Sequence, residues 1–381
     1  MQILEKREVF DYTAKKYQSA HYKIDLYQVF IENSLLLLKK DGFLSYITPN
    51  TYLKNIHSEP LRRFILENTS IIELLMFYYQ VFNQASVDVC ICLIKKTISD
   101  EKHTITIKEA REKLLFKAIH KRQIEQNSFY LNERLAFTVS IDETAKKVVD
   151  KIRLNSSFLG NFCGAYFGIQ TWNRKLYVSK KQNKNYKPVI DGGNIHRYYL
   201  LSPNEYVLFE PNAIKSGGNE KIYLQDRICT RQIGLFPVFS LVKSGIFALN
   251  TVYNIYKKDE NMDLKFILGI LNSKVVQFYW KKLNYDEKRT FPKIKKEALL
   301  TIPIPNLNLN DKIQGKQHEQ LIKLVEAMLE LNKRLLEKNS QTQHDQIKRR
   351  IQHLDQEIDN LVYQLYDLNE TEIALIEGEN V

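Results

Sequence analysis

Arginine and lysine side chains able to bind phosphates or nucleobases gather between residues 164 and 300, in segments predicted to be loops and strand ends. A guanidinium or ammonium group can donate to a phosphate or to O6 and N7 of guanine, and Asn or Gln can bridge an adenine. The candidates are Arg174, Lys175, Arg197, Arg227, Arg231, Lys288, Arg289, Lys293 and Lys295. The basic loop 284–293 also holds two aromatic residues, which favours a nucleic-acid interface. A solvated charge run is the alternative.

The net charge of +12 is unevenly distributed over the 381 residues. Residues 160–310 carry 23 basic and 11 acidic side chains, residues 311–381 carry 9 and 14, and residues 1–159 carry 24 and 19. A basic middle segment beside an acidic tail predicts a module that faces a polyanion, attached to a segment that does not. A generally basic surface without such a partner is the alternative.

Several motifs of known enzyme classes are absent from the sequence. It contains no G-x-x-x-x-G-K-[ST], H-E-x-x-H, G-x-S-x-G or complete G-x-G-x-x-G, and its eight histidines lack ligand spacing, so no metal site is predicted. Cys90, Cys92, Cys163 and Cys229 form no C-x-x-C pair and are expected to be buried thiols. We find no signal peptide and no stretch able to span a membrane, and expect a cytoplasmic protein.

The first hundred residues are predicted to form an α/β structure. A helix over 25–40 with a wide apolar stripe precedes a short buried strand over 43–47. Ser58 can cap a second helix, and strands are predicted over 71–77 and 86–96. The order strand, helix, strand, strand is typical of the back half of a doubly wound sheet.

The middle of the chain has a different character. Residues 97–155 show weak periodicity, with a strand at 103–107 and a basic helix near 109–120. Residues 156–310 are rich in Gly, Asn, Tyr and Phe and alternate in short pieces, which predicts a mostly β domain with long turns. One amphipathic helix over 264–282 interrupts it.

The last 71 residues, 311–381, carry the clearest helical periodicity. Apolar residues step 3-4-3-4 over 321–335 and again over 351–365, and the polar segment 339–343 separates the two seams. Two short heptad seams joined by a turn predict an antiparallel helical hairpin. An intermolecular coiled coil is the alternative.

A set of local strings occurs in a characteristic order along nearly the whole chain. The distinctive ones are LGILNSKVVQFYW…RTFPKIKKEALLTIPIP (268–305) and IDNLVYQLYDLNETEIALIEG (358–378). The others are DLYQVFIENSLLLLKKDGFLSYITPNTYL (25–53), QVFNQASVDVCICLIKK (80–96), GAYFGIQT (164–171), VIDGGNIHRYYL (189–200) and RICTRQIG (227–234). In this order they resemble the C-terminal part of the N6-adenine DNA methyltransferases of type II and type IIG restriction–modification systems, the Taq-like group.

The resemblance implies four segments. Residues 1–98 would be the C-terminal half of a Rossmann-like methyltransferase domain and 99–155 a connecting segment. Residues 156–310 would be a mostly β, α+β target-recognition domain that binds double-stranded DNA, and 311–381 the helical hairpin. The implied function is target recognition in a site-specific adenine-N6 DNA methyltransferase, which in its complete form uses S-adenosylmethionine.

Two motifs of the family are absent from this sequence. The family has a glycine-containing S-adenosylmethionine loop and an Asn/Asp-Pro-Pro-Tyr motif, and neither occurs in the 24 residues before the helix over 25–40. We therefore expect no catalytic residue, no cofactor binding and no methyl transfer from this chain alone. The expected partner is an N-terminal methyltransferase half or a restriction subunit. The alternatives are a stand-alone specificity subunit that recruits an enzyme through its helical tail, and an inert gene remnant.

Three residues of the first segment match site residues of the family. An adenine flipped out of the duplex needs an aromatic face to replace its lost stacking. The resemblance implies this role for Phe82, in the context QVF, and packing under the sheet edge is the alternative. Pro49 and Asn50 match a T-P-N turn at the pocket rim, where they shape the rim or contact the base directly.

Overall fold

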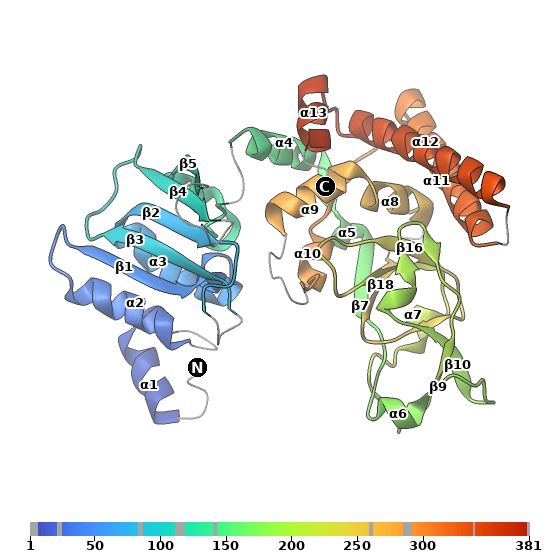
Figure 1. The fold of residues 1–381 in the computed structure, drawn as a ribbon, viewed down its shortest axis with the longest axis horizontal. Coiled ribbons are helices and arrows are strands. Elements are labelled where there is room, and N and C mark those ends of the chain that lie inside the picture. Colours follow the sequence, from blue (N-terminus) through green and yellow to red (C-terminus); the bar gives the residue numbers. More distant parts are fainter. Residues whose placement is uncertain are drawn as a thin grey trace. The chain divides into compact units, whose positions relative to one another are not determined.

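The computed structural model describes residues 7–20, 25–82, 87–110, 119–139, 143–258, 262–284, 292–337 and 340–378. The chain divides into two compact units, unit 1 over Met1–Asp142 and unit 2 over Glu143–Val381 (Figure 1). Each unit has its own β-sheets and its own hydrophobic core.

Unit 1 is built on a five-stranded sheet of order β1-β3-β2-β4-β5. Its strands are β1 (Phe43–Pro49), β2 (Ser70–Phe77), β3 (Val89–Lys95), β4 (Thr104–Ala110) and β5 (Ile119–Glu125). Strand β3 is antiparallel to β1 and β2, whereas β2 and β4 are parallel. The helices are α1 (Arg7–Lys16), α2 (Leu26–Leu37) and α3 (Glu59–Asn68), with 3-10 turns at Asn50–Leu53, Ile56–Ser58, Gln126–Leu131 and Glu133–Leu135.

The predicted helices and strands of the first hundred residues are present, but the sheet extends further than predicted. Strand β4 pairs with β2 and β5 pairs with β4, so residues 104–125 add two strands to unit 1 where a connecting segment was expected. The ends of the expected helix near 109–120 lie in β4 and β5, and its middle, 111–118, lies outside the described residues. The strand predicted over 103–107 corresponds to the start of β4, whereas β5 has apolar residues only at Ile119 and Ile124 and so gives no alternating pattern.

One face of β3 is buried in the core of unit 1. Cys90 and Cys92 are at most 6% exposed and belong to one apolar cluster with Tyr52 and with Ile65 of α3. Burial raises the pKa of the Cys90 thiol to about 11 and that of Cys92 to about 12. The thiols therefore stay protonated at neutral pH, and the expectation of buried thiols is confirmed.

A buried arginine secures the turn that follows β1. Arg62 of α3 is 0% exposed, and its guanidinium donates to the carbonyl oxygens of Tyr52 (2.6 Å), Asn55 (2.7 Å), Arg134 (2.8 Å) and Leu135 (3.1 Å). Arg134 and Leu135 have φ angles of 53° and 56°, a backbone conformation that side chains with a Cβ disfavour. The hydrogen bonds from Arg62 offset that cost and tie two distant loops together.

Unit 2 begins with α4 (Glu143–Leu154) and contains two four-stranded sheets. The antiparallel sheet β16-β15-β18-β7 consists of β7 (Cys163–Phe167), β15 (Arg227–Arg231), β16 (Phe239–Val242) and β18 (Val252–Lys257). The sheet β17-β10-β13-β9 consists of β9 (Val178–Ser179), β10 (Tyr186–Ile190), β13 (Glu205–Leu208) and β17 (Phe247–Ala248). Side chains of both sheets, among them Val207, Cys229 and Phe247, form one core.

Shorter elements complete the middle of unit 2. Three ribbons pair β6 (Ser156–Phe158) with β19 (Pro303–Pro305), β8 (Gln170–Thr171) with β14 (Ile214–Ser216), and β11 (Ile195–His196) with β12 (Tyr199–Leu200). The helices are α5 (Leu159–Phe162), α6 (Arg174–Tyr177), α7 (Glu220–Tyr223), α8 (Leu264–Leu271), α9 (Lys274–Leu283) and α10 (Lys296–Leu300), with a 3-10 turn at Gly192–Asn194. The helix predicted over 264–282 is divided into α8 and α9, because Ser273 caps a new helix through its hydroxyl.

The chain ends in α11 (Lys312–Leu335), α12 (Gln341–Leu365) and α13 (Glu370–Gly378). Helices α11 and α12 pack against each other within the chain, as the predicted hairpin (Figure 1). Helix α11 also packs on α8, where a Cβ on Gly269 would lie 2.9 Å from Val325 Cγ2 and 3.0 Å from Leu321 Cδ1. The hairpin is therefore a packed layer of unit 2.

Candidate nucleic-acid interface

A cavity of about 470 Å³ opens on unit 2 where β7, β8 and β14 meet the segments after β15 and β17. This cavity, hereafter the groove, is lined by Tyr166, Phe167, Gly168, Gln170, Ser216, Gly217, Gln232 and Asn250. A Cβ on Gly168 would lie 1.9 Å from the carbonyl oxygen of Leu249, and one on Gly217 would lie 2.4 Å from that of Gly168. The wall of the groove thus depends on glycine at both positions.

Three amide side chains line the groove. Gln170 and Asn250 are exposed, and Gln232 follows β15 directly. The backbone N–H of Gln232 donates to Thr251 O (2.8 Å), and its carbonyl accepts from Ile294 N (2.9 Å). Within the described part of the chain, the buried Nε2 of Gln232 has no hydrogen-bond partner. An unmade bond of this kind costs free energy, and the amide lies at the wall of the groove.

Backbone pairing brings a distant basic segment to the groove. Residues 292–294 run antiparallel to 232–234, with a bridge between Ile233 and Lys293 and a bond from Gly234 N to Pro292 O (3.0 Å). Two sequence regions that were predicted separately as basic sites therefore lie side by side.

A basic rim results from this pairing. Lys293 and Lys295 are exposed, and Arg231 at the end of β15 is partly exposed. The Nζ of Lys296 lies 5.3 Å from the ring centroid of Phe167, which lines the groove and is 45% exposed. Cationic side chains therefore lie beside hydrogen-bonding amides, an arrangement suited to a phosphate backbone and base edges.

Arg174 and Lys175 lie on the short helix α6, which packs beside β8. The Nη2 of Arg174 donates to Glu205 Oε2 at 2.7 Å in a partly exposed pair. The backbone N–H of Lys175 is capped by Asn173, and its side chain is exposed. Both residues are on the surface of unit 2.

Arg227 cannot contact DNA in this structure, because it is 0% exposed. Its Nε donates to Asn254 Oδ1 at 2.7 Å and its Nη2 to the carbonyl oxygen of Ile246 at 2.5 Å. Alternation places Arg227 and Arg231 on the same face of β15, but only Arg231, at the strand end, reaches the surface. The assignment of Arg227 as a DNA contact is therefore corrected to an internal role.

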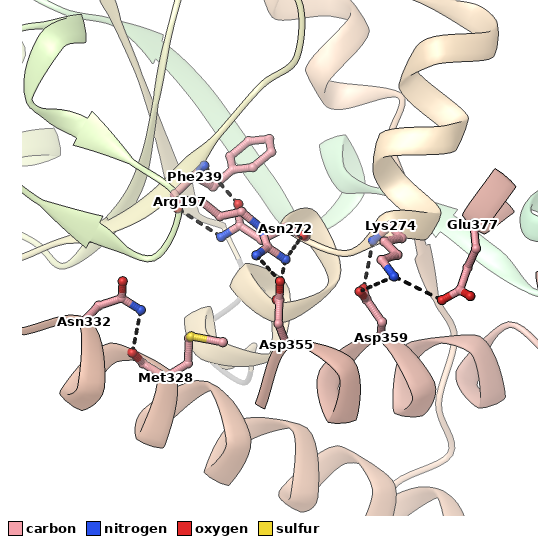
Figure 2. A network of polar contacts seen from close by, with 9 residues as sticks. All are labelled: Arg197, Phe239, Asn272, Lys274, Met328, Asn332, Asp355, Asp359 and Glu377. Atoms are coloured by element: carbon pink, nitrogen blue, oxygen red, sulfur yellow. Dashed lines mark hydrogen bonds and ion pairs between the residues drawn. The ribbon is translucent and has the colours of Figure 1, made fainter. Parts of the chain in front are cut away.

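Arg197 is likewise engaged inside unit 2 (Figure 2). Its Nη1 and Nη2 each bond a carboxylate oxygen of Asp355 on α12 at 2.6 Å. Its Nε and Nη2 also donate to the carbonyl oxygen of Asn272, between α8 and α9. The predicted DNA contact of Arg197 is therefore replaced by an ion pair that fastens the hairpin.

A second carboxylate of α12, Asp359, also bonds to the body of unit 2 (Figure 2). The contacts of Asp355, Asp359 and Glu377 with Arg197 and Lys274 are hereafter the tail junction. Asp359 Oδ1 accepts from the backbone N–H of Lys274 at 2.9 Å, at the start of α9, and Lys274 Nζ lies 3.0 Å from Glu377 Oε1. Burial, together with the nearby Asp355 carboxylate, raises the pKa of Asp359 to about 6. Acidic side chains of the tail thus have partners within the unit.

The predicted site residues of unit 1 lie at one end of its sheet. Pro49 ends β1, paired with Val89, and Asn50 N donates to Asp88 O (3.0 Å). Phe82 follows the end of β2 and is 43% exposed, which does not fit the alternative of a packed side chain. Strands β1 and β2 run in the same direction, so both segments emerge at the same end.

Three further predictions concern the basic loop 284–293, metal ligands and membrane spans. Lys288 and Arg289 lie outside the described residues. Within the ranges that are described, no group of three or more His, Cys, Asp or Glu is placed to hold a metal ion. Among the helices of those same ranges, none is both long and apolar enough to cross a membrane.

The groove is lined by four residues that the sequence did not indicate, namely Phe167, Gln170, Gln232 and Asn250, and Lys296, also not indicated, lies beside Phe167. Two of the family-like strings contain Gln170 and Gln232, but an amide in a groove has the same local signal as any surface amide. Lys296 adjoins the predicted Lys295, so the basic residues at 293–296 were the sequence signal from which Lys296 could have been predicted.

Two family models match this chain. Residues 187–304 match the TaqI-like C-terminal specificity domain, and residues 2–82 match the Eco57I restriction-modification methylase. The first match contains Gln232 and the lysines of the rim, and the second contains Phe82. The predicted resemblance to the C-terminal part of a restriction–modification methyltransferase is confirmed.

The curated relatives include type II restriction enzymes and methyltransferases. The chain is 28% identical over 320 residues to the type II restriction enzyme and methyltransferase RM.Eco57I of Escherichia coli, which covers 79% of this chain and 26% of that protein. It is 24% identical over 379 residues to the type II methyltransferase M.HincII of Haemophilus influenzae, which covers 86% of this chain and 75% of that protein. The chain therefore spans about a quarter of RM.Eco57I.

A solved structure supports the fold. The type IIL restriction–modification enzyme MmeI, determined in complex with DNA, is similar with a TM-score of 0.62 at 13% identity. The similarity covers 97% of this chain and 54% of the MmeI chain.

Proposed function

We propose that unit 2 recognises a short sequence in double-stranded DNA. It would be the target-recognition part of a site-specific adenine-N6 methyltransferase in a cytoplasmic restriction–modification system. The observation that carries this proposal is the groove, where Gln232 and Asn250 adjoin exposed lysines, all within residues 187–304, the segment similar to the TaqI-like specificity domain.

The groove has the chemistry for both kinds of DNA contact. A glutamine or asparagine amide pairs with N6 and N7 of adenine, and an arginine with O6 and N7 of guanine. Gln232 and Arg231 are suited to these roles, and Lys293 and Lys295 to phosphate oxygens. Each phosphate contact adds salt dependence, whereas base contacts add sequence preference.

Unit 1 would be the C-terminal half of a Rossmann-like methyltransferase domain. Its match to the methylase model and the mixed sheet with helices support this assignment. In the complete enzyme, a methyltransferase segment that joins unit 1 would bind S-adenosylmethionine and would contain the Asn-Pro-Pro-Tyr motif. Phe82 would then stack on the flipped adenine, with Pro49 and Asn50 at the rim of its pocket.

The edge of the unit 1 sheet has the character of a surface that pairs with a methyltransferase segment. In the sheet as described, β1 is an end strand, and it exposes Phe43 (58%), Tyr46 (40%) and Ile47 (42%). Helix α2, which packs on β1, exposes Phe30 (58%) and Leu37 (79%). An exposed apolar edge strand favours pairing with another strand, which a methyltransferase segment would supply.

A stand-alone specificity subunit that recruits its enzyme through the tail is the second candidate. The contacts favour the first, because α11 and α12 bury their apolar seams within unit 2 and Asp355 and Asp359 bond to it. A specificity subunit also has no use for a methylase-like unit 1.

Selection from a library of randomised duplexes tests the proposal. The chain should enrich one short motif, and Gln232→Ala should lose preference at one base pair, at a cost of about 1–3 kcal/mol for the favoured base. Gln352→Ala, exposed on α12, is the matched control and should keep the motif. A chain that enriches no motif and binds duplex independently of salt would refute target recognition.

The role of unit 1 is tested in an enzyme reconstituted with the methyltransferase segment. Phe82→Ala should lower the rate of methyl transfer by roughly the 1–3 kcal/mol of one stacked base, and change duplex affinity little. Equal losses of rate and affinity would show that Phe82 supports the fold. This chain alone should neither bind S-adenosylmethionine in calorimetry nor methylate DNA.

A further inference from the structure

An exposed tryptophan stands beside the groove. Trp172 directly follows β8, and its side chain is 64% exposed. Its backbone N–H donates to Ala213 O at 3.1 Å, which continues the pairing of β8 with β14. Gln170, two residues earlier, lines the groove. Two residues of extended chain span about 7 Å, so Trp172 flanks the groove at close range.

The surroundings of Trp172 are strongly basic. Residues 160–190 contain no acidic residue, and their exposed basic side chains are Arg174, Lys175, Lys180, Lys181, Lys184 and Lys187. Lys215 of β14 is exposed too, and its Nζ lies 5.5 Å from the ring centroid of Trp172. Helix α6 and β9, which carry part of this segment, lie at the end of unit 2 away from α11 and α12 (Figure 1).

The fold of unit 2 does not account for this side chain. Trp280, the other tryptophan, is 1% exposed in the core, whereas Trp172 leaves most of its ring in solvent. Leu176 on α6, also exposed at 65%, adds apolar surface nearby. A large aromatic ring among cations has the composition of surfaces that insert into nucleic acid.

We propose that Trp172 inserts into double-stranded DNA as a wedge at a base step beside the sequence that the groove reads. The surrounding lysines contact the phosphates on either side. The inference rests on the proposed function and deepens it, because a wedge adds affinity and DNA distortion without reading base edges. A polyanion is the occupant that fits, since the exposed lysines of this segment outnumber the nearby carboxylate of Glu205, which pairs with Arg174.

Tryptophan fluorescence tests the wedge directly, because the two tryptophans differ in exposure. Acrylamide should quench Trp172 and spare Trp280 in the free chain, and saturating duplex should protect Trp172. A duplex with 2-aminopurine at the contacted step should brighten as its stacking opens. Trp172→Ala should abolish that signal and lower duplex affinity about tenfold, and Trp172→Phe should retain most of both.

The control variant is Leu309→Ala, at a 56% exposed leucine before the helical hairpin, which should change none of these readings. If Trp172 stays quenchable in the complex and Trp172→Ala binds duplex like the wild type, the wedge is overturned while DNA recognition stands. If the wild-type chain does not bind duplex, both fall. Binding of an acidic protein, but not DNA, through Trp172 would also overturn the inference.

Discussion

The groove and the tail junction are both charged regions of unit 2, yet they use charge in opposite ways. At the tail junction, Arg197 and Lys274 are held by the carboxylates of Asp355, Asp359 and Glu377 (Figure 2). At the groove, cationic side chains of two segments extend along one surface beside amides. Basic residues of unit 2 therefore occur in two settings, and the carboxylates of the tail distinguish the first from the second.

This difference has a physical cause. A guanidinium that is removed from water must be paired and hydrogen-bonded, because desolvation of an isolated charge is costly. Arg197 and Arg227 satisfy that condition with carboxylate, amide and carbonyl oxygens of unit 2. An exposed side chain at the rim, such as Lys295, keeps its water, and under the proposed function it would exchange that water for phosphate oxygens, with release of counterions.

Arg197→Ala should have the largest effect on stability. The variant leaves Asp355 without its bidentate partner and should lower the free energy of unfolding by about 3 kcal/mol. Urea unfolding measures this, and binding to duplex under native conditions should keep its salt dependence. If the variant were as stable as the wild type but had lost DNA binding, Arg197 would be assigned to the DNA interface and not to the tail junction.

Asp359→Asn should remove a pH dependence of stability. Burial raises the pKa of Asp359 from 3.8 to about 6, so the folded chain holds this proton where the unfolded chain releases it. The contribution of Asp359 to stability is therefore greatest below about pH 4 and falls by about 2–3 kcal/mol as the pH rises to about 6. Urea titrations across this range should show the fall in wild type relative to the variant. A constant difference between the two at every pH would contradict it.

Lys295→Gln should reduce DNA binding without affecting the fold. Loss of one phosphate contact should make the slope of log K against log salt less steep by about 0.9, with unfolding unchanged. Lys323→Gln, an exposed lysine on α11, serves as the matched control and should leave the slope as it is. If both variants showed the same slope of log K against log salt, Lys295 would not contact a DNA phosphate.

Arg174→Ala should lower stability far less than Arg197→Ala. Its ion pair with Glu205 is half exposed on the arginine side, and such pairs contribute less than about 1 kcal/mol. Thermal unfolding should therefore hardly change, in contrast to Arg197→Ala. A loss as large as that of Arg197→Ala would show that exposure does not separate the two classes of arginine.

Most secondary structure was predictable from local pattern. The heptad steps of 321–335 and 351–365 appear as α11 and α12, and the strands over 43–47 and 71–77 as β1 and β2. These segments bury one face, and a periodic face is recorded in the sequence. Strand β4 was indicated over 103–107, and β5 was missed because its apolar residues, Ile119 and Ile124, do not alternate along the strand.

The sequence by itself determined the family resemblance, the basic middle segment and the helical hairpin, since each depends on residue type, order and spacing. Only the tertiary structure decided which basic residues face solvent: Arg227 is buried and Arg197 pairs with the tail, while the segment around Lys293 joins the one around Gln232. The physical reason is that the cost of burying a charge depends on the partners that distant segments bring to it. A sequence records the charge of a residue but not the partner that the fold supplies.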